Sequence, residues 1–133
     1  MDILLVLTDS SVECGKALET LKDMGEKFSA GTGVLVVLED LYRLEKASLS
    51  LGLPIPRDAV PEAKKRILDR IQNIWRHIGG QDISMEVVAG DLREEVLKRL
   101  KDKKPDLIIW GCTLTSSLCR IIDEVEIPSL IIK

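Results

Sequence analysis

Residues 3–17 read ILLVLTDSSVECGKA, and this stretch contains the pattern that decides the fold. Its first five residues are aliphatic without alternation, which is typical of a parallel strand covered on both faces. Polar residues from Thr8 to Ser11 end the run, and Ser10 with Glu13 forms a capping box for a helix that follows directly. A buried strand joined to a helix by a short polar turn is the repeating unit of an open α/β sheet.

The same alternation continues to the end of the chain. Further buried-type strands are expected at 34–38, 106–111 and 128–132. A strand with polar residues on one face is expected at the sheet edge, at 83–89. Apolar residues at helical spacing predict helices at 14–28, 58–78, 91–104 and 118–125. We therefore expect an α/β fold, an open five-stranded parallel sheet joined by right-handed crossovers and flanked by helices.

The segment from residue 40 to residue 60 is the one irregularity of this pattern. No helix or strand of ordinary length is predicted in it, and a stretch of this length inside a compact domain is usually functional, mobile or interfacial. Its apolar residues, together with Pro54 and Pro56, favour a packed lid or contact surface over a disordered linker.

Length and composition narrow the class of protein. The 133 residues predict a single domain spanning residues 1–133. With 19 Lys and Arg against 22 Asp and Glu, the net charge of −3 argues against binding to nucleic acid or to an anionic membrane. No apolar run approaches the ~20 residues that a membrane span needs. Lys, Glu and Arg are frequent, whereas Asn and Gln are rare. This bias favours a protein from a thermophilic organism.

The cysteines indicate the compartment. Three scattered cysteines and one histidine argue against a disulfide scaffold and against a zinc site, so a reducing, cytoplasmic setting is expected. Cys14 near the start of the first helix and Cys112 after the fourth strand would form a thiol switch if both were exposed and within disulfide reach. The alternative is that they are buried and act as small hydrophobic residues.

Two segments resemble the universal stress protein family. They are residues 3–17, quoted above, and residues 87–111, VVAGDLREEVLKRLKDKKPDLIIWG; the terminal PSLIIK strand agrees in order and spacing. The resemblance covers nearly the whole chain. It implies the Rossmann-like, adenine nucleotide alpha hydrolase-like topology with strand order 3-2-1-4-5.

That strand order defines the candidate site. It places a topological switch point between the first and fourth strands, where open α/β sheets bind ligands at the carboxyl ends of strands. The candidate binding residues are Asp9, Ser10, Leu38, Gly111, Cys112, Thr113, Thr115 and Ser116.

The loop after the fourth strand departs from the family. Nucleotide-binding members have a Gly-rich loop there, whose amides cradle phosphates. Here Gly111 matches the first glycine, Leu114 stands at the second, and the segment to the last strand is shorter, with Thr115-Ser116 aligned to a Gly-Ser pair. We therefore expect no cofactor and no ATP bound in the usual way, while ATP or AMP remains the alternative ligand. A smaller anion could bind at the helix start at 115–117.

Single residues at the switch point allow two roles each. Asp9 either accepts ribose hydroxyls or binds a metal, or it turns the chain and caps the first helix. Ser10 and Ser11 are interpreted as caps, because the only histidine, His77, is expected near the end of a distant helix and no Ser/His/Asp arrangement results. Trp110 is a candidate for stacking on a ligand or partner.

These observations favour a binding or regulatory module of stress physiology over an enzyme. The alternative is a nucleotide-binding protein or weak ATP hydrolase that uses Asp9 and a divalent metal, with segment 40–60 closing over the crevice. A homodimer is expected through the C-terminal strand, Ser129–Lys133, because its aliphatic edge needs a cover and family members commonly dimerise there. An additional protein partner is left open.

Overall fold

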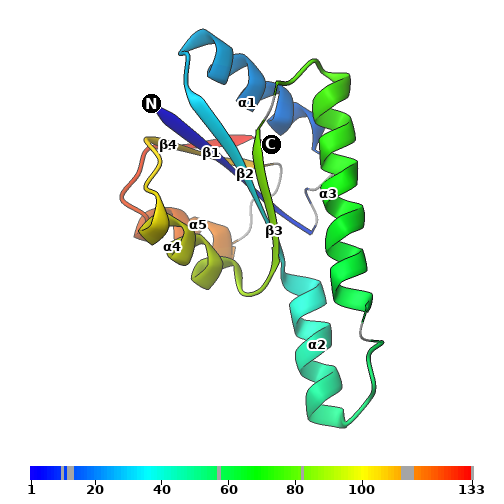
Figure 1. Cartoon of the computed structure of the whole chain (residues 1–133). Coiled ribbons are helices and arrows are strands. Elements are labelled where there is room, and N and C mark those ends of the chain that lie inside the picture. Colours follow the sequence, from blue (N-terminus) through cyan, green and yellow to red (C-terminus); the bar gives the residue numbers. More distant parts are fainter. Residues whose placement is uncertain (10, 12–13, 57, 82, 112–115, 133) are drawn as a thin grey trace.

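The computed structural model describes residues 1–9, 11, 14–56, 58–81, 83–111 and 116–132. Strands and helices alternate along this part of the chain, except where two helices follow β2 (Figure 1). The strands are β1 (Asp2–Thr8), β2 (Gly31–Leu38), β3 (Ser84–Ala89), β4 (Leu107–Gly111) and β5 (Ser129–Ile132). The helices are α1 (Gly15–Lys27), α2 (Glu39–Leu51), α3 (Ala59–His77), α4 (Leu92–Asp102) and α5 (Ser116–Glu124).

The five strands form one parallel sheet in the order β3-β2-β1-β4-β5. This confirms the predicted fold class and strand order, and it confirms β3 as an edge strand. The central strand β1 pairs with β2 on one side and β4 on the other. Its aliphatic run is buried at every residue from Ile3 to Leu7, which explains why it shows no alternation.

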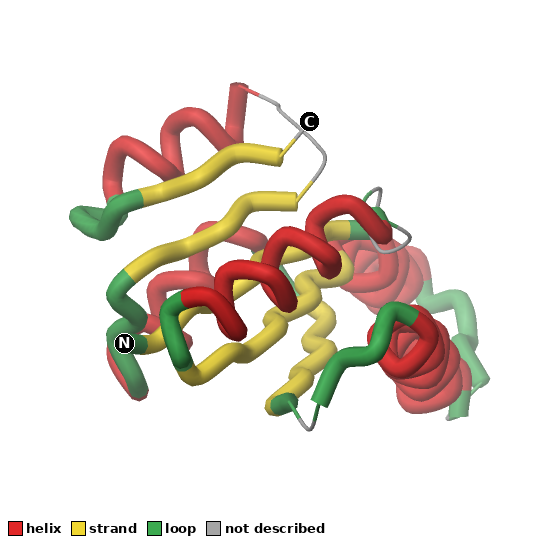
Figure 2. The backbone as a smooth tube through the Cα atoms, turned by 90° about the horizontal axis from the view of Figure 1, so that it is seen from above, coloured by secondary structure: helices red, strands yellow, loops and turns green. Residues whose placement is uncertain are grey.

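Each face of the sheet has its own hydrophobic core, and helices lie on both faces (Figure 2). On one face, Leu5 and Leu7 pack with residues of α1 and α3, including Trp75. On the other, Val6 and Trp110 pack with residues of α4 and α5. Because successive side chains of a strand point to opposite faces, β1 contributes to both cores.

The prediction that segment 40–60 is irregular is wrong for its first half. This half is the helix α2, which follows β2 without a break. All thirteen residues of α2 are described, and only Ser48 among them is buried. Leu44, Leu49 and Leu51 are exposed, so α2 buries little of its apolar surface in the chain itself. Gly52 ends the helix in the left-handed conformation, and α2 projects beyond the end of β2 at the bottom of Figure 1.

The start of α4 follows its local signal. Asp91 and Glu94 have the spacing of a capping box, and Asp91 caps α4 by accepting a hydrogen bond from the Glu94 amide at 3.1 Å. The proposed capping box of Ser10 and Glu13 lies outside the described residues. No helix in the described part of the chain is long and apolar enough to cross a membrane.

Candidate functional site

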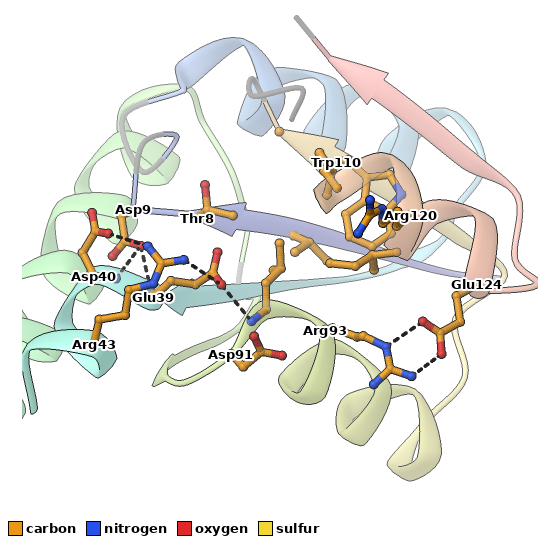
Figure 3. A pocket seen from close by; sticks show the side chains of 15 residues that line it. Thr8, Asp9, Glu39, Asp40, Arg43, Asp91, Arg93, Trp110, Arg120 and Glu124 are labelled. Atoms are coloured by element: carbon orange, nitrogen blue, oxygen red, sulfur yellow. Dashed lines mark hydrogen bonds and ion pairs between the residues drawn. The ribbon is translucent and has the colours of Figure 1, made fainter. Parts of the chain in front are cut away.

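A crevice of about 630 Å³ opens at the carboxyl ends of β1 and β4, the predicted switch point (Figure 3). Its walls come from the ends of these strands, the starts of α2 and α4, and one side of α5. Ten labelled residues with polar or aromatic side chains line it: Thr8, Asp9, Glu39, Asp40, Arg43, Asp91, Arg93, Trp110, Arg120 and Glu124. The crevice therefore combines acidic and basic groups with one buried indole.

Asp9 caps a helix, but not the one expected. Its Oδ2 accepts hydrogen bonds from the backbone amides of Glu39 at 2.7 Å and Asp40 at 3.2 Å, the first two residues of α2. These amides have no partner inside the helix, and a carboxylate at a helix N-terminus also interacts favourably with the helix dipole. Asp9 thus joins the end of β1 to the start of α2.

Gly111 lies where two elements pack closely. A Cβ atom at this position would be 2.4 Å from Cδ2 of Leu7 and 3.3 Å from Cβ of Ala17 in α1. Leu7 and Ala17 are fully buried, so they have little space in which to move. Packing is therefore sufficient to require a glycine here, whether or not the residue also contacts a ligand.

The remaining predicted site residues are not brought to the crevice or are not described. The side chain of Leu38 is buried in the core on the opposite, α1 and α3, face. Ser10, Cys112, Thr113 and Thr115 lie outside the described residues, as does the side chain of Ser116, the first residue of α5. Binding by these residues therefore stays a prediction.

Three arginines of the crevice lining, Arg43, Arg93 and Arg120, are not among the residues predicted from the sequence. Arg43 forms ion pairs with Asp40 at 3.3 Å and Glu39 at 3.7 Å. Arg120 also lines the crevice and has no ion pair with any described residue. The three arginines lie on three different helices, α2, α4 and α5, so no local sequence motif connects them.

Arg93, the third arginine, is held by a carboxylate. Two of its nitrogens donate to the two carboxylate oxygens of Glu124, with Nε 2.7 Å from Oε2. This bidentate pair links α4 to α5 across the wall of the crevice. Hydrogen bonding to Arg93 lowers the pKa of Glu124 below its usual range, and Glu124 raises the pKa of Arg93.

The acidic side of the crevice is used for structure. Oε2 of Glu39 lies 3.4 Å from the amide of Leu92, the first residue of α4, which donates to it. Asp91 caps the same helix. No group of three or more His, Cys, Asp or Glu side chains among the described residues is arranged to hold a metal ion.

Ser11 stabilises the turn after β1. Its Oγ accepts a hydrogen bond from the Thr8 amide at 2.8 Å, and the side chain is buried, in line with a structural role. His77 is the last residue of α3, remote from the crevice lining. Cys14 is the N-cap residue of α1, packs against the core and is disulfide-bonded, so it is not a free thiol in this structure. Cys112 lies outside the described residues, and the thiol switch of Cys14 and Cys112 stays a hypothesis.

Comparison with known proteins agrees with the fold. The model of the universal stress protein family matches residues 1–124. A universal stress protein from Aquifex aeolicus (strain VF5) is 40% identical in an alignment of 135 positions, which covers 100% of both chains. The structure of the universal stress protein from Archaeoglobus fulgidus in complex with dAMP has a TM-score of 0.66 at 16% identity, covering 100% of this chain and 98% of that one. A universal stress protein family protein from Arabidopsis thaliana with AMP bound has a TM-score of 0.64 at 16% identity, covering 100% and 91%.

Proposed function

This chain belongs to the universal stress protein family, and on that basis we propose that it is a binding and regulatory module of stress physiology rather than an enzyme. In this proposal a small ligand enters the crevice between β1 and β4, and occupancy is passed to a partner protein in the cytoplasm. Open α/β sheets bind ligands at this position, and the crevice is large enough for one.

The observation that carries the proposal is that the Asp9 carboxylate caps α2. A hydrolase of the alternative type would need this carboxylate to hold a divalent metal or a ribose. Here its Oδ2 accepts two amides of α2, at 2.7 and 3.2 Å. Withdrawing that oxygen would leave the first turn of α2 without its cap. The contact therefore favours a structural use of Asp9 and a crevice that binds without reacting.

Sequence supports the further proposal that ATP is not held in the family's usual way. Leu114 stands where the second loop glycine is expected, and the loop is short. A side chain restricts the close approach of backbone amides to phosphates that glycine allows. Family structures with AMP or dAMP bound keep a monophosphate as the alternative ligand.

Isothermal titration calorimetry with Mg-ATP and with AMP, together with a phosphate-release assay, tests this function. We expect no micromolar affinity for Mg-ATP and no turnover. Micromolar Mg-ATP binding would overturn the loop argument. Phosphate release that is lost in Asp9→Asn but kept in Asp69→Asn, at an exposed position of α3 outside the crevice lining, would establish the hydrolase instead.

We also propose that two copies associate through the C-terminal strand. β5 is an edge strand of the sheet, and its Leu130 and Ile131 are 37% and 38% exposed. Edge strands of this kind are usually covered, because their unpaired backbone groups template further pairing. A twofold partner would cover both edges at once.

Sedimentation equilibrium at micromolar concentration tests the dimer. We expect a dimer for the native chain and a monomer for Ile131→Lys. Glu86→Lys, on the opposite edge strand β3, is the matched control and should stay dimeric. A native chain that is monomeric throughout would contradict the proposal, as would an Ile131→Lys variant that dimerises like the native chain.

A further inference from the structure

The two tryptophans of the chain differ in how their indole N–H groups are satisfied. Nε1 of Trp75 donates to the backbone oxygen of Gln81 at 2.5 Å. Nε1 of Trp110 is buried and meets no hydrogen-bond acceptor among the described residues. A buried donor without an acceptor costs about 1–3 kcal/mol, so such groups are uncommon and usually meet a water, an ion or a ligand.

Trp110 lines the crevice. It is the fourth residue of β4, is 1% exposed, and belongs to the core between the sheet and helices α4 and α5. Because Nε1 has almost no exposed surface, a ligand in the crevice reaches it only when the side chains that cover it move aside.

Arg120 supplies a charge on the same side of the crevice, as Figure 3 shows. The other two arginines of the lining are neutralised, Arg43 by Glu39 and Asp40, and Arg93 by Glu124. Arg120 is exposed and pairs with no carboxylate among the described residues. A guanidinium in this state is ready for an anion, for which its planar set of donors is well suited.

The acidic groups lie at the other side, around the starts of α2 and α4. Asp9 and Asp91 accept backbone amides there, and Glu39 and Asp40 pair with Arg43. These carboxylates are thus engaged by the chain itself, whereas the donors without a partner among the described residues, Trp110 Nε1 and Arg120, belong to β4 and α5.

We propose that Trp110 Nε1–H and the Arg120 guanidinium form an anion subsite that binds the phosphate of a phosphate monoester. In this subsite, side chains take the place of the backbone amides of a Gly-rich loop. The inference rests on the proposed binding function and specifies its ligand class. One neutral donor and one cation match a single phosphate group better than a triphosphate, which gathers several charges.

Nuclear magnetic resonance of the indole N–H groups tests the subsite directly. The chain has two tryptophans, so a ¹⁵N-labelled sample gives two indole cross-peaks, and Trp110→Phe identifies one of them. We expect AMP and inorganic phosphate to shift the Trp110 peak and leave the Trp75 peak in place. Adenosine, which lacks the phosphate, should leave the Trp110 peak unshifted.

Calorimetry with AMP on Arg120→Gln provides the second readout. Loss of a charge-assisted hydrogen bond should weaken AMP binding by roughly tenfold or more. Arg66→Gln, at an exposed position on α3 outside the crevice lining, is the matched control and should bind AMP like the native chain. The urea midpoint of both variants shows whether the fold is kept.

The outcomes separate the two proposals. If AMP binds but the Trp110 peak does not move and Arg120→Gln binds normally, the subsite is wrong and the binding function stands. If neither AMP nor phosphate binds, the subsite is also wrong. If both readouts respond while Mg-ATP is hydrolysed, the subsite is supported and the non-enzymatic function is overturned.

Discussion

The two helices that begin at the crevice, α2 and α4, are held by different kinds of contact. α4 has its own N-cap, Asp91, and buries Leu92 and Val96 against the sheet. α2 is capped by Asp9, which lies 30 residues earlier in the chain, and exposes most of its leucines. α4 is therefore fixed by local capping and hydrophobic burial, whereas α2 is attached at its start and extends into solvent. A helix can be part of the same site without being part of the core.

The largest expected difference between the two helices is in their leucines. Leu92→Ala in α4 should lower the free energy of unfolding by about 2–5 kcal/mol, because it leaves a cavity at a position only 5% exposed. Leu49→Ala in α2, at a position 84% exposed, should change it by less than about 0.5 kcal/mol. Urea denaturation measures both. Equal losses would show that α2 is packed as firmly as α4.

The next effect concerns the two caps. Asp9→Ala should cost about 1–2 kcal/mol and speed hydrogen exchange in the first turn of α2, which contains Glu39 and Asp40. Asp91→Ala is the matched change and should loosen the first turn of α4 instead. Exchange measured by mass spectrometry on peptides locates each effect. Asp9→Ala without any change in α2 would contradict the long-range cap.

The end of α2 provides a smaller effect. Gly52 has φ 68°, a left-handed conformation, so Gly52→Ala should cost about 1 kcal/mol and shorten α2 at its exposed end. Gly15→Ala is the control, because a Cβ there meets no atom within 4 Å. Urea denaturation and circular dichroism compare the two variants. If Gly52→Ala were as stable as Gly15→Ala, the left-handed cap would not be required.

The smallest effect is the pH dependence of the pair that joins α4 to α5. Arg93 lowers the pKa of Glu124 in the folded chain, so the pair stabilises the fold when pH is above the unfolded pKa of Glu, about 4.3. This contribution is lost as the pH falls through the lower pKa of the folded state. The stability difference between the native chain and Glu124→Gln should therefore shrink on acidification. Glu126→Gln, an exposed neighbour, should show no such trend.

Most of the fold was predictable because its signals are local. The aliphatic run of β1, the stripe of α3 and the Asp91 cap each depend on residues close together in the sequence, and the structure contains all three. The strand order, by contrast, came from a family resemblance. α2 was missed because it has no capping side chain of its own at Leu38 and its cap, Asp9, is remote in sequence.

The candidate site was predictable in position but only partly in content. The switch point follows from the order of the strands, and Asp9 and Gly111 are found there. The arginines at 43, 93 and 120 could not be placed, because they lie on three different helices and no spacing rule relates them. Their pairing states were equally inaccessible, because each depends on which carboxylate the fold brings near.

The sequence by itself therefore determined the alternation of buried strands and helices, because burial on both faces dictates continuous aliphatic runs. It also determined that the loop after β4 lacks the expected second glycine, since residue identity alone decides this. Only the tertiary structure decided that Asp9 caps α2, that Trp110 has a buried, unpaired N–H, and that Arg120 is free of carboxylates among the described residues. The reason is physical: hydrogen bonds and ion pairs between remote residues exist only once packing has set their distances.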